Sequence, residues 1–329
     1  MLNDKTILVT GGTGSFGVKF IEKLLINDQP KKIIVFSRDE LKQFEMQSRI
    51  SSSKLRFFLG DVRDYQRLKQ ATYGVDVIIH AAALKQIPAA EYNPMEAIKT
   101  NIIGAENIIN VAIENGVNRV IALSTDKAAN PANLYGATKL CSDKLMIAGN
   151  VLAGLRDTRF SVVRYGNVLG SRGSVIPFFK DHAPKGYLPI TDLNMTRFWL
   201  TIEDGVQFVL NSLNRMQGGE IFVPKIPSFK VVDVAEVVSP NTPTKIIGIR
   251  PGEKLHEVMI TEDDSNYTVE FDDYYAVLAP FLLDTDFYRN NGVKVPVGFS
   301  FTSENNKLWH THQTFKSELI RAGIISDSI

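Results

Sequence analysis

Short apolar runs rich in β-branched residues alternate with longer amphipathic segments through the first half of the chain. Because these runs are continuous instead of alternating with polar residues, they are typical of parallel strands buried on both faces of a sheet. We expect strands at residues 5–10, 31–37, 55–61, 75–83, 119–125 and 159–165. The pattern predicts an α/β fold with a doubly wound parallel (Rossmann) sheet.

The best-marked helix is expected to begin at Asn93 and to end near Gly116. Asparagine suits the cap of a helix, and Pro94 suits its first turn. Glu96 stands where a capping box with Asn93 would need it. We expect this long helix to cover the sheet.

Beyond Tyr165 the alternation weakens, and recurring prolines divide the chain into small elements. We expect helices at 203–216 and 233–238, a strand at 244–249 and a strand pair at 271–281. The predicted organisation is an NADP-binding Rossmann domain at residues 1–165, followed by a second part at residues 166–329. The second part is expected to be mainly a smaller α/β substrate lobe, with room for elements that return to the first domain.

Composition excludes some classes of partner and compartment. The 329 residues include 37 basic and 36 acidic side chains, so no net field favours nucleic acid or an anionic membrane as a partner. The chain opens directly into a strand, and no apolar stretch approaches the roughly 20 residues needed to span a bilayer. The single cysteine, Cys141, cannot form an internal disulfide and is expected to be a small buried helix residue. We expect a cytoplasmic protein.

A glycine-rich turn, "TGGTGSFG", follows the first strand and opens a helix. Glycine allows a tight turn and lets a pyrophosphate approach the positive end of the helix. The G-x-x-G-x-x-G spacing is typical of short-chain dehydrogenase/reductase relatives. The expected dinucleotide-binding residues of this turn are Gly11, Thr13, Gly14, Ser15, Phe16 and Gly17.

The end of the second strand bears on which nicotinamide cofactor is bound. An acidic residue there would hold the ribose 2′-hydroxyl of NAD, but the chain has Ser37 and Arg38. Arginine can bind a 2′-phosphate with two donors, and Lys42 can add a second charge. These residues favour NADP. Asp39 leaves NAD open, because it can either cap the next helix or face the ribose.

Tyr135 and Lys139 are four residues apart in a segment predicted to be helical, so both can face the cofactor. A lysine ammonium favours the phenolate and would lower the pKa of the tyrosine. Thr125, at the end of the fifth strand, can bind the same substrate hydroxyl. These three residues can oxidise a secondary alcohol.

Asp126 and Lys127 follow directly and can supply an acid and a base for the loss of water. Oxidation of a hydroxyl to a ketone makes the neighbouring C–H acidic, so a base there can remove the proton while an acid protonates a hydroxyl one carbon further on. Lys127 must be neutral when it acts, and we expect burial or Lys139 to lower its pKa. The alternative is that Asp126 caps a loop and Lys127 is a solvated charge.

Several motifs, including "TGGTGSFG", "FSRDELKQFEM", "IALSTDKAANPANLYGATKL", "SVVRYGNVLGSRGSVIPFF" and "KIIGIRPGEKLHEVMI", closely resemble the inverting UDP-N-acetylglucosamine 4,6-dehydratases that begin pseudaminic acid biosynthesis. The resemblance covers roughly residues 5 to 265. Retaining relatives carry Asp-Glu where this chain has Asp126 and Lys127, so the lysine favours the inverting subclass.

The resemblance implies an internal redox cycle that gives UDP-2-acetamido-2,6-dideoxy-β-L-arabino-hexos-4-ulose. Tyr135 would take the O4 proton while hydride passes from C4 to NADP⁺. Lys127 and Asp126 would drive loss of water across C5 and C6, and hydride would return to C6. Protonation from the opposite face would invert C5, with the donor, Lys127 or Tyr135, left open.

The resemblance also implies binding residues and a homo-oligomer such as a hexamer, and the five histidines show no pattern of metal ligands. Further cofactor contacts would come from Asp61, Val62, Ala81, Ala82, Ala83 and Asn101. Substrate contacts would come from Lys85, Asn167, Arg172, Arg197 and Arg250, the last two on the diphosphate.

Three other functions use parts of the same constellation. A UDP-sugar 4-epimerase would use Thr125, Tyr135 and Lys139 without needing Lys127. A C5-retaining 4,6-dehydratase would share the elimination. A non-catalytic NADP(H) sensor would keep the glycine turn and would typically lose the tyrosine and the lysine.

Overall fold

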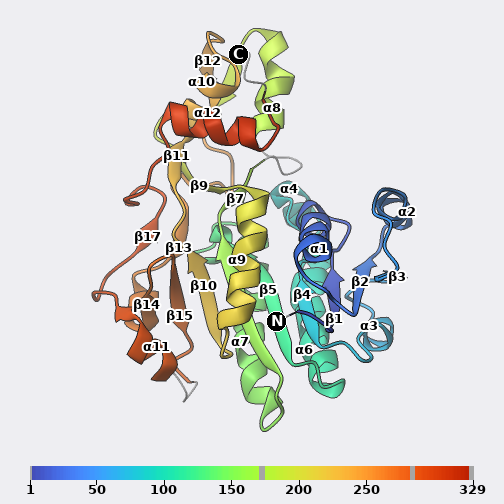
Figure 1. Ribbon diagram of the computed structural model, residues 1–329. Coiled ribbons are helices and arrows are strands. Elements are labelled where there is room, and N and C mark those ends of the chain that lie inside the picture. The colour runs from blue at the N-terminus through green and yellow to red at the C-terminus, as the bar shows by residue number, and fades with distance from the viewer. Residues whose placement is uncertain (1, 170–174, 282–285, 326–329) are drawn as a thin grey trace.

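The computed structural model describes residues 2–169, 175–281 and 286–325 and shows a large body topped by a smaller lobe (Figure 1). Within these residues the body contains one ten-stranded sheet of order β16-β14-β15-β10-β6-β5-β4-β1-β2-β3. Every pairing from β10 to β3 is parallel. The predicted Rossmann sheet is confirmed. Its first six strands are β1 (Thr6–Thr10), β2 (Lys32–Ser37), β3 (Leu55–Leu59), β4 (Val77–His80), β5 (Arg119–Thr125) and β6 (Arg159–Tyr165).

Helices cover both faces of this sheet (Figure 1). One face carries α1 beside α9, and the other carries α3, α6 and α7 in a row. Strands β1 and β4 are therefore buried at every position, which explains their continuous apolar runs. The covering helices are α1 (Ser15–Asn27), α3 (Tyr65–Ala71), α6 (Gly104–Glu114), α7 (Leu134–Ala153) and α9 (Ile202–Arg215).

The helix predicted at 93–116 consists of three segments: α5 (Pro94–Ile98), a π-helical turn η1 (Lys99–Ile103) and α6. The expected capping box is wrong. Asn93 also ends α4, and its side-chain amide donates to the carbonyl of Ala89 at 3.1 Å. Glu96 pairs instead with Arg63.

The second half of the chain does not stay in the small lobe. Strand β10 (Glu220–Pro224) adds to β6 in parallel, and three antiparallel strands then extend the sheet. These are β14 (Thr268–Glu270), β15 (Tyr274–Leu278) and β16 (Val293–Lys294). Residues 271–281 contain one strand, β15, instead of the expected pair; its antiparallel neighbour β14 ends at Glu270, before this segment.

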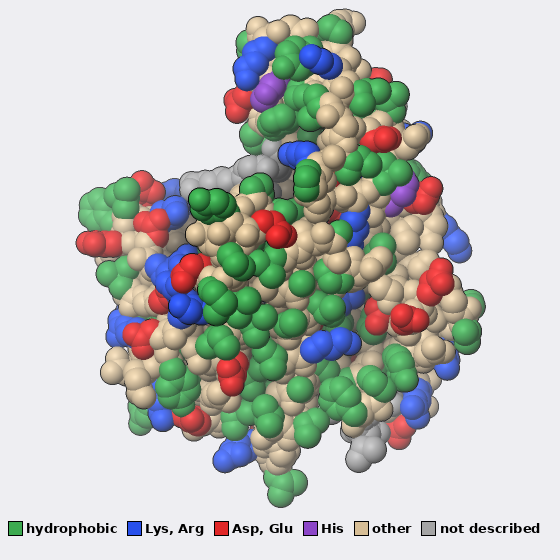
Figure 2. Space-filling view, turned by 180° about the vertical axis from the view of Figure 1, so that it is seen from behind, with side chains coloured by type: hydrophobic (Ala, Val, Ile, Leu, Met, Phe, Trp, Pro, Cys, Tyr) green, Lys and Arg blue, Asp and Glu red, His purple; other side chains and the backbone are tan. Residues whose placement is uncertain are grey.

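The small lobe has its own apolar core between three helices and short strands. Trp199 packs edge-on against Phe229 and Phe315, with ring centroids 4.4 and 4.8 Å away. Seen from behind, the lobe stands off the large body (Figure 2). Its elements are α8 (Val175–His182), β8 (Leu188–Ile190), α10 (Val231–Val238), β12 (Thr244–Ile246) and α12 (His312–Arg321), and β7 (Asn167–Val168), β9 (Thr196–Leu200) and β11 (Ser228–Lys230) form a three-stranded sheet. The remaining elements are α2 (Glu40–Arg49), α4 (Ile87–Tyr92), the 3₁₀ turns η2 (Asp126–Ala128), η3 (Ala183–Lys185) and η4 (Asp263–Tyr267), β13 (Val258–Ile260), α11 (Asp286–Asn291) and β17 (Phe301–Thr302).

Cys141 is exposed, so the expectation that it is buried is wrong. Helix α7 buries Lys139, Ser142, Asp143 and Met146, which share the opposite stripe of the helix. No helix in the described ranges combines the length and the apolar character that crossing a bilayer requires.

Candidate active site

The expected site residues gather at the edge of the sheet where the parallel strands end. The register places Thr10 beside His80 and Thr125 beside Tyr165, so the carboxyl ends of β1, β4, β5 and β6 line up. Ligands of open α/β sheets bind outside this edge. Burial lowers the pKa of His80 to about 3, and its ring Nδ1 hydrogen-bonds to the Thr10 hydroxyl at 2.8 Å. This histidine is structural.

The glycine turn lies directly against the end of β4. Gly11 has a φ of +64°, and a Cβ there would stand 2.9 Å from the Ala82 nitrogen and 3.0 Å from the Ala81 carbonyl carbon. Glycine is therefore required both by the conformation and by the close approach. Gly14 begins α1 without any side-chain cap, which leaves backbone donors at the positive end of the helix for an anion. The turn fits a dinucleotide pyrophosphate.

At the end of β2, Asp39 caps α2, although its side chain is still 41% exposed. Its carboxylate accepts the Lys42 backbone N–H at 3.0 Å and pairs with Lys42 Nζ at 2.6 Å. Arg38 is half exposed and lies 3.6 Å from Asp61. Burial favours the neutral form of Asp61, but the hydrogen bonds and charge of Arg63, with Arg38, outweigh it and lower the pKa of this carboxyl. The Arg38 side chain is 51% exposed and that of Lys42 is 43% exposed, so both cations can reach solvent at this corner.

Asn101 lies in the π-helical turn η1 and holds the segment that leaves β4. Its side chain accepts the Leu84 N–H at 2.8 Å and donates to the Leu84 carbonyl at 2.9 Å. A further hydrogen bond at 3.0 Å joins it to Thr138 on α7. Asn101 thus fixes the loop after Ala83 to α7, and Lys85, the residue that follows Leu84, is exposed.

The first turn of α7 packs tightly against the segment that contains Lys127. Asn133 caps α7 by accepting the Gly136 N–H at 2.8 Å. A Cβ on Gly136 would overlap with the Lys127 carbonyl oxygen. The absence of a side chain at this position therefore allows Tyr135 to lie next to Thr125 and Lys127.

Tyr135 and Lys139 share one face of α7, as the spacing predicts. Burial raises the pKa of Tyr135 to about 12, and the charge of Lys127 and a hydrogen bond with Thr125 only partly offset this. The prediction that a neighbouring lysine leaves the phenol with a lowered pKa is therefore wrong for the protein alone. Burial lowers the pKa of Lys139, and the charge of Asp143 opposes it.

Asp143 continues the same face one turn beyond Lys139 and is fully buried. It accepts a hydrogen bond from Ser124 at 2.7 Å and pairs with Arg164 at 3.3 Å. A buried carboxylate needs such partners to remain charged. Asp143 therefore ties α7 to the ends of β5 and β6 behind the reacting residues.

Asp126, Lys127 and Glu257 form the most concentrated group of buried charges in the site. Lys127 Nζ lies 3.0 Å from Asp126 Oδ1 and 3.0 Å from Glu257 Oε1. The Asp126 side chain is 1% exposed and that of Glu257 is 3% exposed. Lys127 therefore points into the site, and the alternative of a solvated charge does not describe it.

The charges of this group decide its protonation. Burial alone would lower the pKa of Lys127, but Asp126 and Glu257 outweigh it and raise that pKa, so the expectation of a lowered value is wrong. Burial, followed by the charge of Glu257, raises the pKa of Asp126. Asp126 Oδ2 is buried with no hydrogen-bond partner among the described residues. Protonation would lower the free-energy cost of burying this oxygen, and a hydrogen-bond donor from a ligand would pair it.

The proposed substrate arginines occupy different surroundings. Arg197 is buried, and its guanidinium donates to the backbone carbonyls of Thr196, Leu255 and Lys254 at 2.7 to 3.0 Å. Arg250 is largely exposed and pairs with Glu253 at 2.7 Å. Binding of diphosphate by either arginine stays a prediction.

Two more expected substrate residues lie nearby in the chain. Asn167 is in β7, and its Oδ1 is buried with no hydrogen-bond partner among the described residues. Arg172 lies outside the described residues.

Sequence reasoning missed Glu257, Asp143 and Lys254. Asp143 continues the Tyr135 and Lys139 spacing by one more turn, which is a usable signal. Glu257 and Lys254 lie within the quoted motif "RPGEKLHEVMI", but only the fold brings this segment to Lys127.

The contact at Gly136 leads to a testable prediction. We expect Gly136→Ala to lower kcat roughly tenfold or more, because the added methyl must push α7 away from the Lys127 carbonyl and displace Tyr135. The matched control is Gly205→Ala near the start of α9, where the Cβ would meet only the Leu200 side chain at 3.3 Å. Equal activity of the two variants would show that the contact at Gly136 does not position the site.

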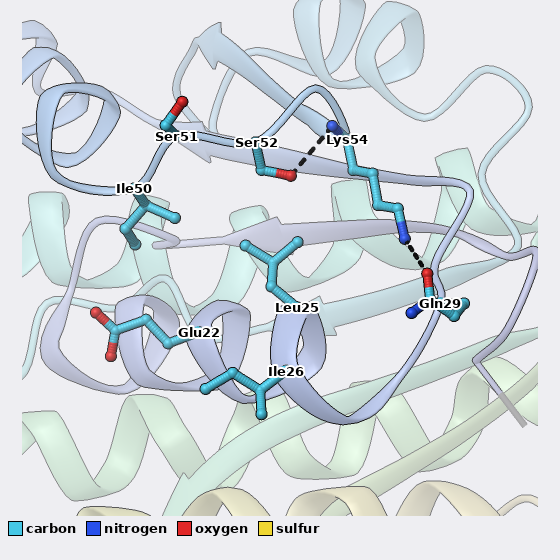
Figure 3. Close-up of a pocket in the computed structure, with 8 residues that line it drawn as sticks. All are labelled: Glu22, Leu25, Ile26, Gln29, Ile50, Ser51, Ser52 and Lys54. Atoms are coloured by element: carbon cyan, nitrogen blue, oxygen red, sulfur yellow. Dashed lines mark hydrogen bonds between the residues drawn. The ribbon is translucent and has the colours of Figure 1, made fainter.

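A shallow groove elsewhere on the body lies away from the residues of the candidate active site. Glu22, Leu25 and Ile26 line it from α1, and Ile50 to Ser52 and Lys54 line it from the segment before β3 (Figure 3). It therefore lies toward the amino ends of the strands, at the opposite edge of the sheet from Thr125 and Lys127.

The chain matches the family described as "Polysaccharide biosynthesis protein" over residues 7–279. It is 59% identical over 318 residues to the "UDP-N-acetylglucosamine 4,6-dehydratase (inverting)" of Campylobacter jejuni, covering 94% of this chain and 95% of that protein. It is 44% identical over 286 residues to the "UDP-glucose 4-epimerase" of Rickettsia canadensis, covering 84% of each. Among solved structures it is similar to "Pen from Bacillus thuringiensis", with a TM-score of 0.90 and 33% identity over 99% of this chain and 100% of that one.

Proposed function

We propose, from the premise that the chain belongs to the polysaccharide biosynthesis protein family, that it is an NADP-dependent UDP-N-acetylglucosamine 4,6-dehydratase that inverts C5. One observation supports this above the others: Lys127 Nζ lies between the buried carboxylates of Asp126 and Glu257, next to Tyr135. Hydroxyl oxidation alone does not need that group, whereas elimination of water needs an acid and a base side by side.

The glycine turn and its neighbours would hold the cofactor. Gly11 and Gly14 would receive the pyrophosphate, Arg38 the adenosine 2′-phosphate, and Tyr135 and Lys139 would face the nicotinamide ribose. When bound, a nicotinamide would supply the acceptor for a hydrogen and its electron pair from C4 and the donor of that pair to C6. Asp39 caps its own helix, so no acidic side chain is committed to the ribose 2′-hydroxyl in the way NAD selection requires.

The side chains of the site then divide the proton transfers. Tyr135 takes the O4 proton in its phenolate form as the C4 ketone forms, and the charge of Lys127 and the hydrogen bond with Thr125 favour that form against burial. The ketone acidifies the C5–H bond, and the neutral amine of Lys127 takes that proton. Asp126 gives a proton to the C6 hydroxyl, whose C–O bond breaks to release water. The raised pKa of Asp126 keeps its carboxyl protonated further toward neutral pH, as an acid in this step requires.

Reprotonation of C5 from the opposite face completes the inversion. Lys127, which has just gained the C5 proton, and Tyr135, which has gained the O4 proton, are the two side chains able to supply it.

Arg38 offers a test of cofactor preference. We expect Arg38→Ala to weaken NADP binding about 10- to 100-fold, the loss of one charge-assisted contact, and to leave NAD binding nearly unchanged. Fluorescence titration with each cofactor measures both constants. Arg49→Ala, which removes an exposed arginine at the end of α2, is the control. Equal losses for NADP and NAD would contradict the proposed role.

The reaction itself is tested by mass spectrometry of the nucleotide sugar. Purified protein with NADP and UDP-N-acetylglucosamine should give a product lighter by one water, with no external reductant consumed. A UDP-sugar 4-epimerase would leave the mass unchanged, and this outcome would overturn the proposal.

A further inference from the structure

Glu257 is held rigidly just before β13. Its backbone N–H donates to the Ser303 hydroxyl at 2.9 Å, and its carbonyl accepts the Ser303 N–H at 2.8 Å. The residue is 2% exposed. Its carboxylate therefore has a fixed position beneath the surface of the site.

Three cations face this carboxylate. Lys127 Nζ lies 3.0 Å from Oε1, Arg197 Nε lies 3.7 Å from the same oxygen, and Lys254 Nζ lies 3.9 Å from Oε2. Arg197 and Lys254 are themselves anchored, because Arg197 donates to backbone carbonyls and Lys254 donates to the Ala129 carbonyl at 2.9 Å. Of these three cations, Lys127 also contacts Asp126, the proposed proton donor of the elimination.

Without Glu257, the charges around Lys127 would go from balanced to net positive. The charged or titratable groups that face Lys127 are Asp126, Glu257, Tyr135, Arg197 and Lys254. Two of these are fixed cations, so Asp126 would remain as the single compensating carboxylate, and it is also the proposed proton donor. A second carboxylate is needed to keep the ammonium stable while Asp126 carries its proton.

We propose that Glu257 is a positioning residue of the dehydration step, which holds Lys127 Nζ against Asp126 and sets the pH at which that amine gives up its proton to solvent and becomes the base. The inference rests on the proposed function for its catalytic meaning. Glu257 makes no contact with the substrate in this proposal. It acts through Lys127.

The test measures how readily Lys127 loses its proton, without substrate. Wild-type protein, Glu257→Gln and Glu257→Asp are labelled briefly with acetic anhydride at several alkaline pH values. Mass spectrometry then gives the labelling rate of Lys127 relative to Lys144, an exposed lysine of α7. Because the neutral amine is the reactive form, Glu257→Gln should raise the relative rate about tenfold or more at one pH, equivalent to about one pKa unit.

Glu257→Asp keeps the charge and should stay near the wild-type rate. In the dehydration assay, the rising limb of the pH profile should move to lower pH in Glu257→Gln and not in Glu257→Asp. Relative labelling of Lys127 in Glu257→Gln within twofold of wild type would overturn the inference. A wild-type protein that releases no water would overturn the proposed function instead, and the labelling result would still decide whether Glu257 holds the proton on Lys127.

Discussion

Lys127→Ala is expected to bind NADP and UDP-N-acetylglucosamine and to lose dehydration by a factor of about 10² to 10⁴, the usual range for a general base. The C5 proton then has no acceptor beside Asp126, whereas Tyr135, Thr125 and Lys139 remain to oxidise C4. The variant should therefore stop at the ketone, and reduced nicotinamide should accumulate. After rapid mixing, near-ultraviolet absorbance measures the reduced nicotinamide, and mass spectrometry of the sugar measures the ketone.

Removing Lys127 also leaves two buried carboxylates facing each other, so folding must be checked separately. Arg197 and Lys254 still compensate Glu257, and Asp126 can take up a proton. Lys144→Ala, on the exposed side of α7, is the matched control and should retain full activity. A folded Lys127→Ala protein that releases water at the wild-type rate would rule out the lysine as the base.

Tyr135→Phe is expected to fail one step earlier, with kcat about 10²- to 10⁴-fold lower and no accumulation of reduced nicotinamide. The phenylalanine ring fills the same buried space but cannot accept the O4 proton. Since C4 oxidation precedes acidification of C5, exchange of the C5 hydrogen with solvent should be lost as well. Tyr73→Phe, at an exposed tyrosine after α3, controls for loss of a hydroxyl.

The two variants together test the order of the steps. Lys127→Ala should oxidise without eliminating, and Tyr135→Phe should do neither. Accumulation of reduced nicotinamide in Tyr135→Phe would mean that another group accepts the O4 proton, and the role given to Tyr135 would then be wrong.

The parts of this molecule that sequence could predict are those set by local pattern. The six parallel strands, the glycine turn and the pairing of Tyr135 with Lys139 each depend on neighbouring residues in one element, and the structure confirms their placement. The resemblance to inverting dehydratases also depends on contiguous motifs, and the 59% identity to the Campylobacter jejuni protein confirms it.

Several of the parts that failed depend on partners from distant segments. The sequence predicts a lowered pKa for Lys127, but its neighbour Asp126 and then Glu257, from a distant segment, together outweigh the effect of burial. The capping box at Asn93 and Glu96 has the right local spacing, yet Arg63 takes the glutamate. Cys141 is exposed because the buried stripe of α7 runs along its other side, which composition alone does not reveal.

The most direct test of the central claim, that Lys127 and Asp126 remove water across C5 and C6 with inversion, is proton NMR of the reaction in deuterated water. The protein with NADP and UDP-N-acetylglucosamine should give a 4-keto-6-deoxy sugar with deuterium at C5 and the arabino configuration. A product with the C5 configuration of the substrate, or one without a C4 ketone and a C6 methyl group, would contradict the account.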